Sequence, residues 1–351
     1  MKIAGMSACV PKNAVETTLA YEHFKKFDVD RIRKNTGVEQ KREAEEGVTA
    51  TDLCIAAARP LIESLGWEPE SIDALVLITT LPDYIMPASA HRAQHELGIS
   101  PRCLVFDMTL GCSGFTHGMI ILDGLIKSGV VKRALLLCGE MTSDRFRPRL
   151  EKAVHRTDLA NALLFGDAGS ATAVTAEGEP QVRSVVFGAD GSGVDQIIVP
   201  GGLGKTFWSP ELFERVADEE GDERRPIDLI LRGPQILTFT MKRVPPMLAE
   251  LCEGAGWTKD DVNVYALHQA NKFMLTFLAR KMKIDKAKVP FSIEKFGNTS
   301  SASIPLTMIT QCQERLKVPT KWAMMGFGVG LSWSGLMVET DEVFSLPLIE
   351  V

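Results

Sequence analysis

Three side chains of this sequence have types and surroundings that suit nucleophilic catalysis: Cys112, His268 and Asn298. Cys112 lies in Leu-Gly-Cys-Ser-Gly-Phe, where small neighbours leave room for a substrate, and a predicted strand ends before it while a predicted helix begins after it. A thiol near a helix N-terminus faces unpaired backbone N–H groups and the positive end of the helix dipole, which favour the thiolate. We therefore expect Cys112 to be a nucleophile rather than an inert buried cysteine.

His268 and Asn298 stand where polar side chains can assist such a nucleophile. His268 directly follows an apolar segment, in Ala-Leu-His-Gln-Ala-Asn, and strand ends are where α/β proteins place reactive side chains. Asn298 lies in Gly-Asn-Thr-Ser-Ser-Ala-Ser. Each has a structural alternative, as a core or capping histidine and as a turn or N-cap asparagine. Taken alone, the two interpretations of each residue are evenly balanced.

Other histidines and a phosphate-loop mimic are weaker candidates. His117 lies five positions after Cys112, about 140° around a helix, so His268 is the preferred partner. His91 and His95 have the i, i+4 spacing of a metal site but lack the glutamate of His-Glu-x-x-His, which favours a solvated helix face. The segment 204–206, Gly-Lys-Thr, lacks the earlier glycine that a phosphate loop requires.

Short apolar runs alternate along the chain with longer segments of helical spacing, which predicts an α/β protein with buried, mostly parallel or mixed sheets. The expected strands are 74–78, 103–106, 134–138, 182–187, 196–199, 262–267 and 322–325. The expected helices are 52–65, 89–97, 115–127, 236–252, 272–282 and 305–316.

An internal repeat indicates two similar halves. Gly-Trp recurs at 66 and 256, Gly111-Cys112 matches Gly297-Asn298, and Cys138-Gly139 matches Met325-Gly326, all with offsets of about 186–190 residues. Chance similarity of such short segments is the alternative. If the repeat is real, residues 1–178 and 179–351 pack about a pseudo-two-fold axis, and Cys112 and Asn298 occupy equivalent places. The segment 201–226 has no counterpart and is expected to be a surface insertion.

Length and composition limit the class of protein. The chain of 351 residues suggests two or three domain-sized units, and its net charge of -6 argues against a general nucleic-acid binder. The sequence contains no run of about 18 apolar residues, so it predicts no membrane span. The N-terminus turns polar too soon for a secretory signal. The seven cysteines are odd in number and widely spaced, so we expect no disulfide framework or Cys-x-x-Cys metal site and a cytoplasmic protein.

The three motifs together resemble the Cys-His-Asn triad of the β-ketoacyl-acyl-carrier-protein synthase III family, within the thiolase superfamily. Further matches are Phe165-Gly-Asp-Ala-Gly169, the segment from Gly326 to Trp333, and Asn35-Thr-Gly-Val38. The resemblance covers nearly the whole chain apart from insertions around 145–156 and 203–226. It implies the thiolase fold, with two halves in five alternating layers of helices and sheets, and a homodimer. It implies no metal or redox cofactor.

The resemblance also implies the chemistry. Cys112 would take an acyl group from a thioester, and a malonyl thioester would then lose carbon dioxide and attack the acyl group to give a 3-oxoacyl product. His268 and Asn298 would donate hydrogen bonds to the malonyl thioester oxygen, and the backbone N–H groups of Cys112 and Val329 would hold the oxyanion of acyl transfer. Asn271, Met86, Phe327, Thr36 and Asn35 are the implied substrate-binding residues. Lys272 and Arg280 are candidates for docking an acyl carrier protein.

The sequence departs from the family where acyl-CoA is expected to bind. Arg31 stands where a stacking tryptophan is expected, and Asn35 and Leu159 stand where arginines are expected. We therefore hypothesise that the acyl donor is carrier-bound, or is a longer or unusual acyl-CoA, and both fatty-acid initiation and a specialised pathway remain open. The alternatives are acyl transfer to a hydroxyl or amine without decarboxylation, and a non-catalytic acyl-carrier or acyl-CoA binding subunit.

Overall fold

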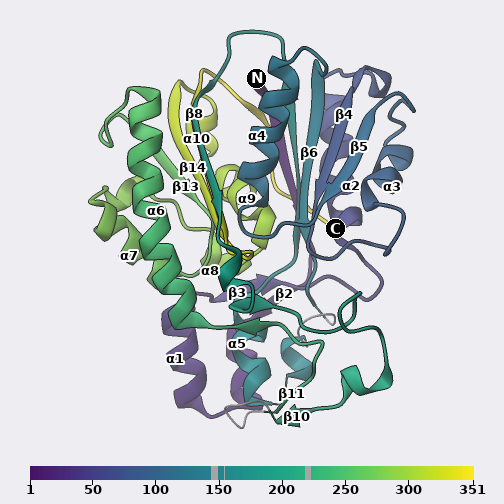
Figure 1. The fold of residues 1–351 in the computed structure, drawn as a ribbon, viewed down its shortest axis with the longest axis vertical. Coiled ribbons are helices and arrows are strands. Elements are labelled where there is room, and N and C mark those ends of the chain that lie inside the picture. The colour runs from purple at the N-terminus through teal and green to yellow at the C-terminus, as the bar shows by residue number, and fades with distance from the viewer. Residues whose placement is uncertain (144–148, 154, 218–222) are drawn as a thin grey trace.

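Two β-sheets that share the order and directions of four strands form the centre of the molecule (Figure 1). The computed structural model describes residues 1–143, 149–153, 155–217 and 223–351. In each sheet the first two neighbouring pairs are antiparallel and the following pairs are parallel. The first sheet has the order β1 (Lys2–Val10), β7 (Ala168–Thr175), β6 (Arg133–Glu140), β4 (Ala74–Ile78) and β5 (Leu104–Met108). The second has the order β8 (Val182–Ala189), β15 (Ser332–Thr340), β14 (Thr320–Gly328) and β13 (Val264–Leu267).

Helices cover both sheets and fill the space between them. Helices α2 (Ala50–Ser64) and α3 (Ser89–Glu96) cover the outer face of the first sheet, and α6 (Gly233–Ala255) and α7 (Lys272–Met282) cover the outer face of the second. Between the sheets lie α4 (Gly114–Lys127) and α9 (Ser303–Gln311) (Figure 1). The predicted five-layered α/β architecture is therefore confirmed.

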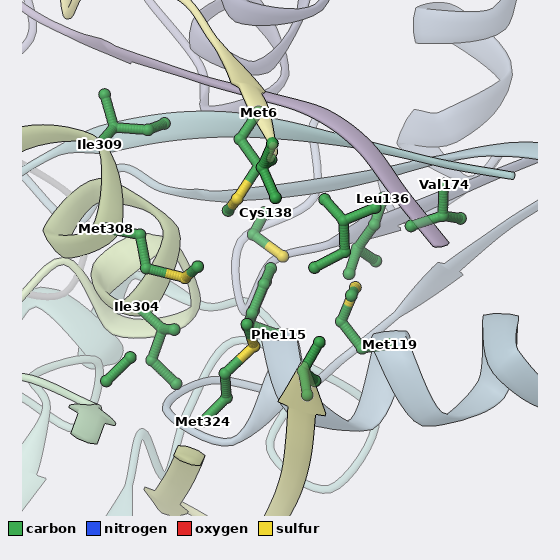
Figure 2. Packing of buried hydrophobic residues seen from close by; sticks show 14 of the residues in the cluster. Met6, Phe115, Met119, Leu136, Cys138, Val174, Ile304, Met308, Ile309 and Met324 are labelled. Carbon is green, nitrogen blue, oxygen red and sulfur yellow. The ribbon is translucent and has the colours of Figure 1, made fainter. Parts of the chain in front are cut away.

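The middle layer is a continuous apolar core (Figure 2). Phe115 and Met119 of α4 and Met324 of β14 are at most 1% exposed, and they meet Met6 and Leu136 of the first sheet in one cluster. Burying a side chain of this size contributes about 1.5–3 kcal/mol. Helix α4 is therefore clamped between two sheets, and the turn at its beginning is held rigidly.

A smaller group of elements lies at one end of the molecule (Figure 1). Its apolar cluster joins α1 to α5 and contains Val29, Leu159 and Leu163. The C-terminal tail returns to the first sheet, where its two short strands pair with β1. The elements at that end and in the tail are β2 (Ala14–Glu16), η1 (Thr17–Glu22), α1 (Lys26–Thr36), β3 (Gln40–Arg42), α5 (Arg156–Leu164), β10 (Val216–Ala217), β11 (Glu223–Arg224), β16 (Phe344–Ser345) and β17 (Ile349–Glu350).

Most predicted elements have counterparts, and the exceptions have physical reasons. Strand β4 and helix α7 match their predicted ranges, whereas the predicted helix 305–316 is interrupted at Cys312 between α9 and α10 (Gln313–Leu316). Strands β1, β7 and β15 and helices α1 and α5 were not predicted. Strand β7 has the sequence AGSATAVT, whose small residues carry little apolar signal but let α2 approach closely. A Cβ on Gly169 would lie 2.4 Å from the Leu53 backbone.

The segment 201–226 joins β9 (Ile197–Ile198) to the region before β12 (Ile230–Leu231), and these two strands pair with each other. Its described residues are largely exposed, and Arg215 anchors it to Asp158 of α5 at 2.7 Å. The charged run at 218–222 lies outside the described residues. Among the described helices, none is both long and apolar enough to cross a bilayer.

Candidate active site

Cys112 lies in the turn between β5 and α4, where the two sheets approach each other. Hydroxyl pairs join this turn to β15: Ser113 Oγ lies 2.7 Å from Ser332 Oγ, and Thr116 Oγ1 lies 2.5 Å from Ser334 Oγ. Strand β14 approaches so closely that a Cβ on Gly328 would lie 2.8 Å from Cys112 Sγ. Gly328 has a φ of 154°, in a region that favours glycine, so only glycine fits this contact without strain.

Burial of the sulfur raises the pKa of the Cys112 thiol to about 11. The backbone N–H groups of Val329 and of Cys112 itself favour the thiolate, whereas the nearby Glu140 carboxylate disfavours it. Burial therefore opposes the effect of the helix N-terminus, which is expected to favour the thiolate. The sulfur packs under the β14–β15 loop, only partly exposed, and the cost of desolvating the anion exceeds the gain from the neighbouring hydrogen bonds.

Alkylation of Cys112 by iodoacetamide is expected to increase about tenfold per pH unit from pH 7 to pH 10, because the thiolate fraction rises in this way below a pKa of about 11. The measurement is the rate of label incorporation into the Cys112 peptide, followed by mass spectrometry. A rate that levels off near pH 8 would instead indicate the low pKa of a helix-activated thiol.

His268 lies at the end of β13 and is 1% exposed. Its ring packs edge-on against Phe327 of β14, with 5.8 Å between ring centroids, and its Nδ1 lies 2.8 Å from Ser303 Oγ. Burial lowers the pKa of His268 to about 3, against a smaller effect of the Ser300 backbone that raises it. The imidazole is therefore neutral at physiological pH.

Ser303 is the hydrogen-bond partner of Nδ1 in this neutral ring. Ser303 Oγ accepts a hydrogen bond from the backbone N–H of Gln269, at 3.4 Å, so its own hydrogen can point to Nδ1 of His268. With Nδ1 accepting from this hydroxyl, the proton of the neutral ring lies on Nε2, and this is the tautomer that the proposed chemistry requires. A neutral imidazole with Nε2–H can donate a hydrogen bond to an oxygen that develops negative charge.

Asn298 is held on both sides of its backbone. Its N–H donates to Leu164 O at 2.8 Å, and its carbonyl accepts from the Gly166 N–H at 3.2 Å. A Cβ on Gly166 would lie 2.0 Å from Phe296 O, so the glycine allows this contact. The motif Phe165–Gly169 thus positions Asn298. In the sequence, this motif was noted only as a match to the family.

The side-chain amide of Asn298 has a defined orientation. Its Oδ1 accepts the Ser300 N–H at 2.9 Å, and its Nδ2 makes only a long contact of 3.5 Å with Ala270 O. The amide nitrogen therefore presents an N–H that can bind a substrate oxygen. Because Ser300 also contacts Cys112 and His268, the structure brings the three predicted residues to one place.

The other predicted binding residues have different surroundings. Phe327 is 1% exposed and supports His268, and Thr36 Oγ1 bonds to Ile32 O within α1. Asn271 is the N-cap of α7, since its Oδ1 accepts the Met274 N–H at 2.7 Å. Asn35 is exposed on α1. Met86 is 80% exposed on the loop after β4.

Ser300, Ser303 and Glu140 were not predicted from the sequence. Glu140 is 2% exposed at the end of β6, where its carboxylate accepts hydrogen bonds of 2.6 Å from the N–H and hydroxyl of Thr80. Burial raises the pKa of Glu140 to about 7. The sequence signal that could have identified Glu140 is an acidic residue at the end of an apolar strand. His117, the rejected candidate base, bonds Ser113 O and Ser334 Oγ.

Comparison with known proteins identifies the family of the chain. The family models described as 3-oxoacyl-[acyl-carrier-protein] synthase III and its C-terminal part match residues 106–191 and 252–340. A relative from Streptomyces coelicolor, named β-ketoacyl-[acyl-carrier-protein] synthase III 3, is 30% identical over 336 residues, covering 94% of each chain.

Solved structures agree as well. A 3-oxoacyl-(acyl-carrier protein) synthase from Burkholderia xenovorans has a TM-score of 0.92 and 36% identity, covering all of this chain and 97% of that one. The priming β-ketosynthase of the R1128 polyketide pathway has a TM-score of 0.81 and 26% identity, covering 97% and 96%. The chain therefore belongs to the β-ketoacyl-[acyl-carrier-protein] synthase III family of acyltransferases, which have the thiolase fold.

Proposed function

We propose that this enzyme condenses an acyl thioester with a malonyl thioester through an acyl intermediate on Cys112. The observation that carries the proposal is the fixed amide of Asn298, whose Nδ2 faces the site shared with the neutral ring of His268. Two aimed donors stabilise a developing oxyanion, and removing one such donor typically costs about 100–1,000-fold in rate.

In the first stage, Cys112 Sγ attacks the donor carbonyl, the carbon–sulfur bond to the donor breaks, and the thiol proton leaves on the released donor thiol. The backbone N–H groups of Cys112 and Val329 both hydrogen-bond the sulfur, so they lie beside the carbonyl that it attacks. These groups hold the tetrahedral oxyanion. The buried surroundings strengthen both hydrogen bonds.

In the second stage, the malonyl carboxylate leaves as carbon dioxide, and the electron pair moves onto the thioester as an enolate. His268 Nε2–H and Asn298 Nδ2–H hydrogen-bond its oxygen. The enolate carbon attacks the acyl carbonyl, the bond to Cys112 Sγ breaks, and the sulfur takes a proton from solvent. The protein's own groups supply every hydrogen-bond donor to the oxyanions of this scheme, and we propose that no metal or redox cofactor takes part.

The acyl donor is proposed to differ from acetyl-CoA. Leu159, which stands where an arginine is expected, is 1% exposed within the cluster of α1 and α5 and faces away from solvent. Arg31 lies over the ring of exposed Phe27 at 5.9 Å and pairs with Asp28. A priming ketosynthase of a polyketide pathway among the similar structures supports a specialised role, while the other named relatives support fatty-acid initiation.

An acyl carrier protein is proposed to dock on α7. Phe273 is 53% exposed there, and exposed Arg280 lies over the Phe277 ring at 4.9 Å. Lys272 forms an ion pair with Glu294, so Arg280 and Lys281 are the better charges to reverse. Arg280→Glu with Lys281→Glu should raise KM for carrier-bound malonate on the order of tenfold. Lys132→Glu, an exposed lysine before β6, is the control, and an unchanged KM in the double variant would exclude this surface.

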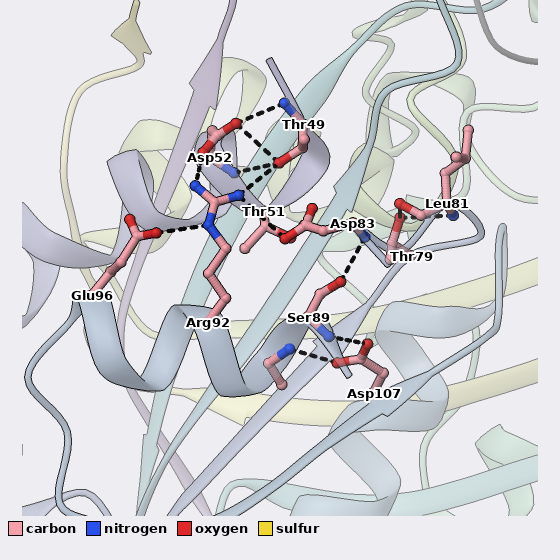
Figure 3. A network of polar contacts seen from close by, with 11 residues as sticks. Thr49, Thr51, Asp52, Thr79, Leu81, Asp83, Ser89, Arg92, Glu96 and Asp107 are labelled. Carbon is pink, nitrogen blue, oxygen red and sulfur yellow. Dashed lines mark hydrogen bonds and ion pairs between the residues drawn. The ribbon is translucent and has the colours of Figure 1, made fainter. Parts of the chain in front are cut away.

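A homodimer is proposed through the edge of the first sheet. Strand β5 ends that sheet and exposes 44% of Leu104, and the loop after β4 exposes Tyr84, Ile85 and Met86. Figure 3 shows the polar network that holds this loop: Asp83 accepts from Thr51 Oγ1 at 2.9 Å and pairs with Arg92 at 3.2 Å. An unpaired edge beside a rigid apolar loop suits a second copy. Light scattering should give twice the chain mass of 38.5 kDa, and a single-chain mass would reject the dimer.

Two further assignments accompany this function. We propose that the halves divide at 178/179, which the shared strand order of the two sheets supports, although β16 and β17 return to the first sheet. A cytoplasmic location is proposed because all seven cysteines are free, as is usual in a reducing compartment. Purification from the cytosolic fraction of its native cell tests the location, and limited proteolysis between 175 and 182 tests the division.

The reaction is tested by mass spectrometry with a panel of acyl-CoA and acyl-carrier donors. We expect an acyl adduct on the Cys112 peptide, followed by release of one carbon dioxide for each 3-oxoacyl product when malonyl thioester is added. No adduct with any donor would favour the non-catalytic binding subunit. An adduct that passes to a hydroxyl or amine without carbon dioxide release would favour the other alternative, which the named relatives do not support.

A further inference from the structure

Ser300 has an unusual backbone at the centre of the site. It begins the short 3-10 turn η7 (Ser300–Ala302) that leads into α9, is 7% exposed, and has a φ of 50°. A non-glycine residue in the left-handed region is uncommon and persists where the surroundings hold it there. This conformation lets the N–H, the carbonyl and the side chain of one residue point to three different neighbours.

Those three neighbours are the three proposed functional residues. The Ser300 N–H donates to Asn298 Oδ1 at 2.9 Å, and the Ser300 backbone is close enough to the ring of His268 to raise its pKa slightly. The Ser300 hydroxyl lies against the turn of Cys112, 3.1 Å from the place that a Cβ on Gly111 would occupy. From there it hydrogen-bonds the sulfur and favours its anion.

We propose that Ser300 is a positioning residue for the condensation, an inference that rests on the proposed function. Its backbone holds the Asn298 amide and the His268 ring in one arrangement, and its hydroxyl donates a hydrogen bond to the Cys112 sulfur whenever that sulfur carries negative charge. The sulfur does so twice in each cycle, on attacking the donor and on leaving the product. The hydroxyl therefore assists acylation, whereas the backbone serves decarboxylation.

This division of labour distinguishes two substitutions. Ser300→Ala removes the hydroxyl and keeps a Cβ in the left-handed backbone. Ser300→Gly also removes the hydroxyl, but glycine adopts this left-handed backbone without steric cost. Both keep the N–H and the carbonyl. Ser301→Ala is the matched control, because Ser301 is the neighbouring buried serine and its hydroxyl makes only a long contact of 3.5 Å with Ile78 O.

The first measurement is the pH profile of iodoacetamide alkylation at Cys112, which needs no substrate. In both Ser300 variants we expect the alkylation rate at pH 8 to fall about tenfold. This loss corresponds to a shift of the pH profile by about one unit toward higher pH. The Ser301→Ala profile should match the wild type. A purely structural role for Ser300 would not move the profile in both variants by the same amount.

The second measurement compares the half-reactions. Acylation of Cys112 should fall about tenfold in the Ser300 variants, while decarboxylation of malonyl thioester stays within about twofold of wild type because the backbone donors remain. Unchanged alkylation profiles in both variants would overturn the proposal, as would equal losses in both half-reactions. Failure of wild-type protein to form any acyl adduct would reject the proposed function instead, since the alkylation profile reads the Ser300 contact independently.

Discussion

Replacing Cys112 by alanine is expected to abolish the acyl adduct and to lower condensation on the order of a million-fold, the scale on which losing the nucleophile of a covalent enzyme acts. The neighbouring groups do not substitute for the sulfur. His268 is neutral, and Glu140 is committed to Thr80. The measurements are adduct mass and formation of the 3-oxoacyl product from an acyl-CoA and malonyl thioester.

Carbon dioxide release from malonyl thioester should survive in this variant, because the donors on His268 and Asn298 do not depend on the thiol. This uncoupling separates loss of the nucleophile from general damage to the site. Cys252→Ala is the matched control, since Cys252 is also a cysteine but lies in α6 on the outer face of the second sheet. A full acyl adduct in Cys112→Ala would show that another residue is the nucleophile.

Removing either oxyanion donor is expected to lower decarboxylation and condensation by about 100–1,000-fold while the acyl adduct on Cys112 still forms. The informative variant is Asn298→Asp, which keeps the shape and the acceptor for the Ser300 N–H but lacks the N–H of Nδ2. It also places a negative charge where the enolate forms. His268→Ala removes the other donor. Single-turnover carbon dioxide release with pre-acylated enzyme measures the effect.

His95→Ala is the control for the histidine variant, because His95 is an exposed histidine of α3. Its rates should match the wild type. Because burial lowers the pKa of His268 to about 3, wild-type decarboxylation should show no inflection from His268 between pH 5 and pH 8. An inflection near pH 6.5 that disappears in His268→Ala would mean that the ring titrates and would contradict its role as a permanently neutral donor.

The local pattern of the sequence was sufficient for the buried parallel strands and the long amphipathic helices. Strand β4, with five consecutive buried residues, and helix α7 were predicted at their observed ranges because a continuous apolar run and a 3.6-residue period are local signals. Strand β7 and helix α5 escaped prediction. Their small or mixed residues are buried by elements distant in the chain, among them α2 on β7 and α1 on α5, which no local window contains.

The sequence was sufficient to propose the three residues Cys112, His268 and Asn298 and their order, because each stands in a short motif. The protonation and orientation of those residues were not readable. The pKa of the Cys112 thiol depends on Val329 and Glu140. The orientation of Asn298 depends on the hydrogen bonds to Leu164 and Ser300. Burial and hydrogen-bond geometry are set by segments up to about 200 residues apart along the chain, and only the packed sheets bring them together.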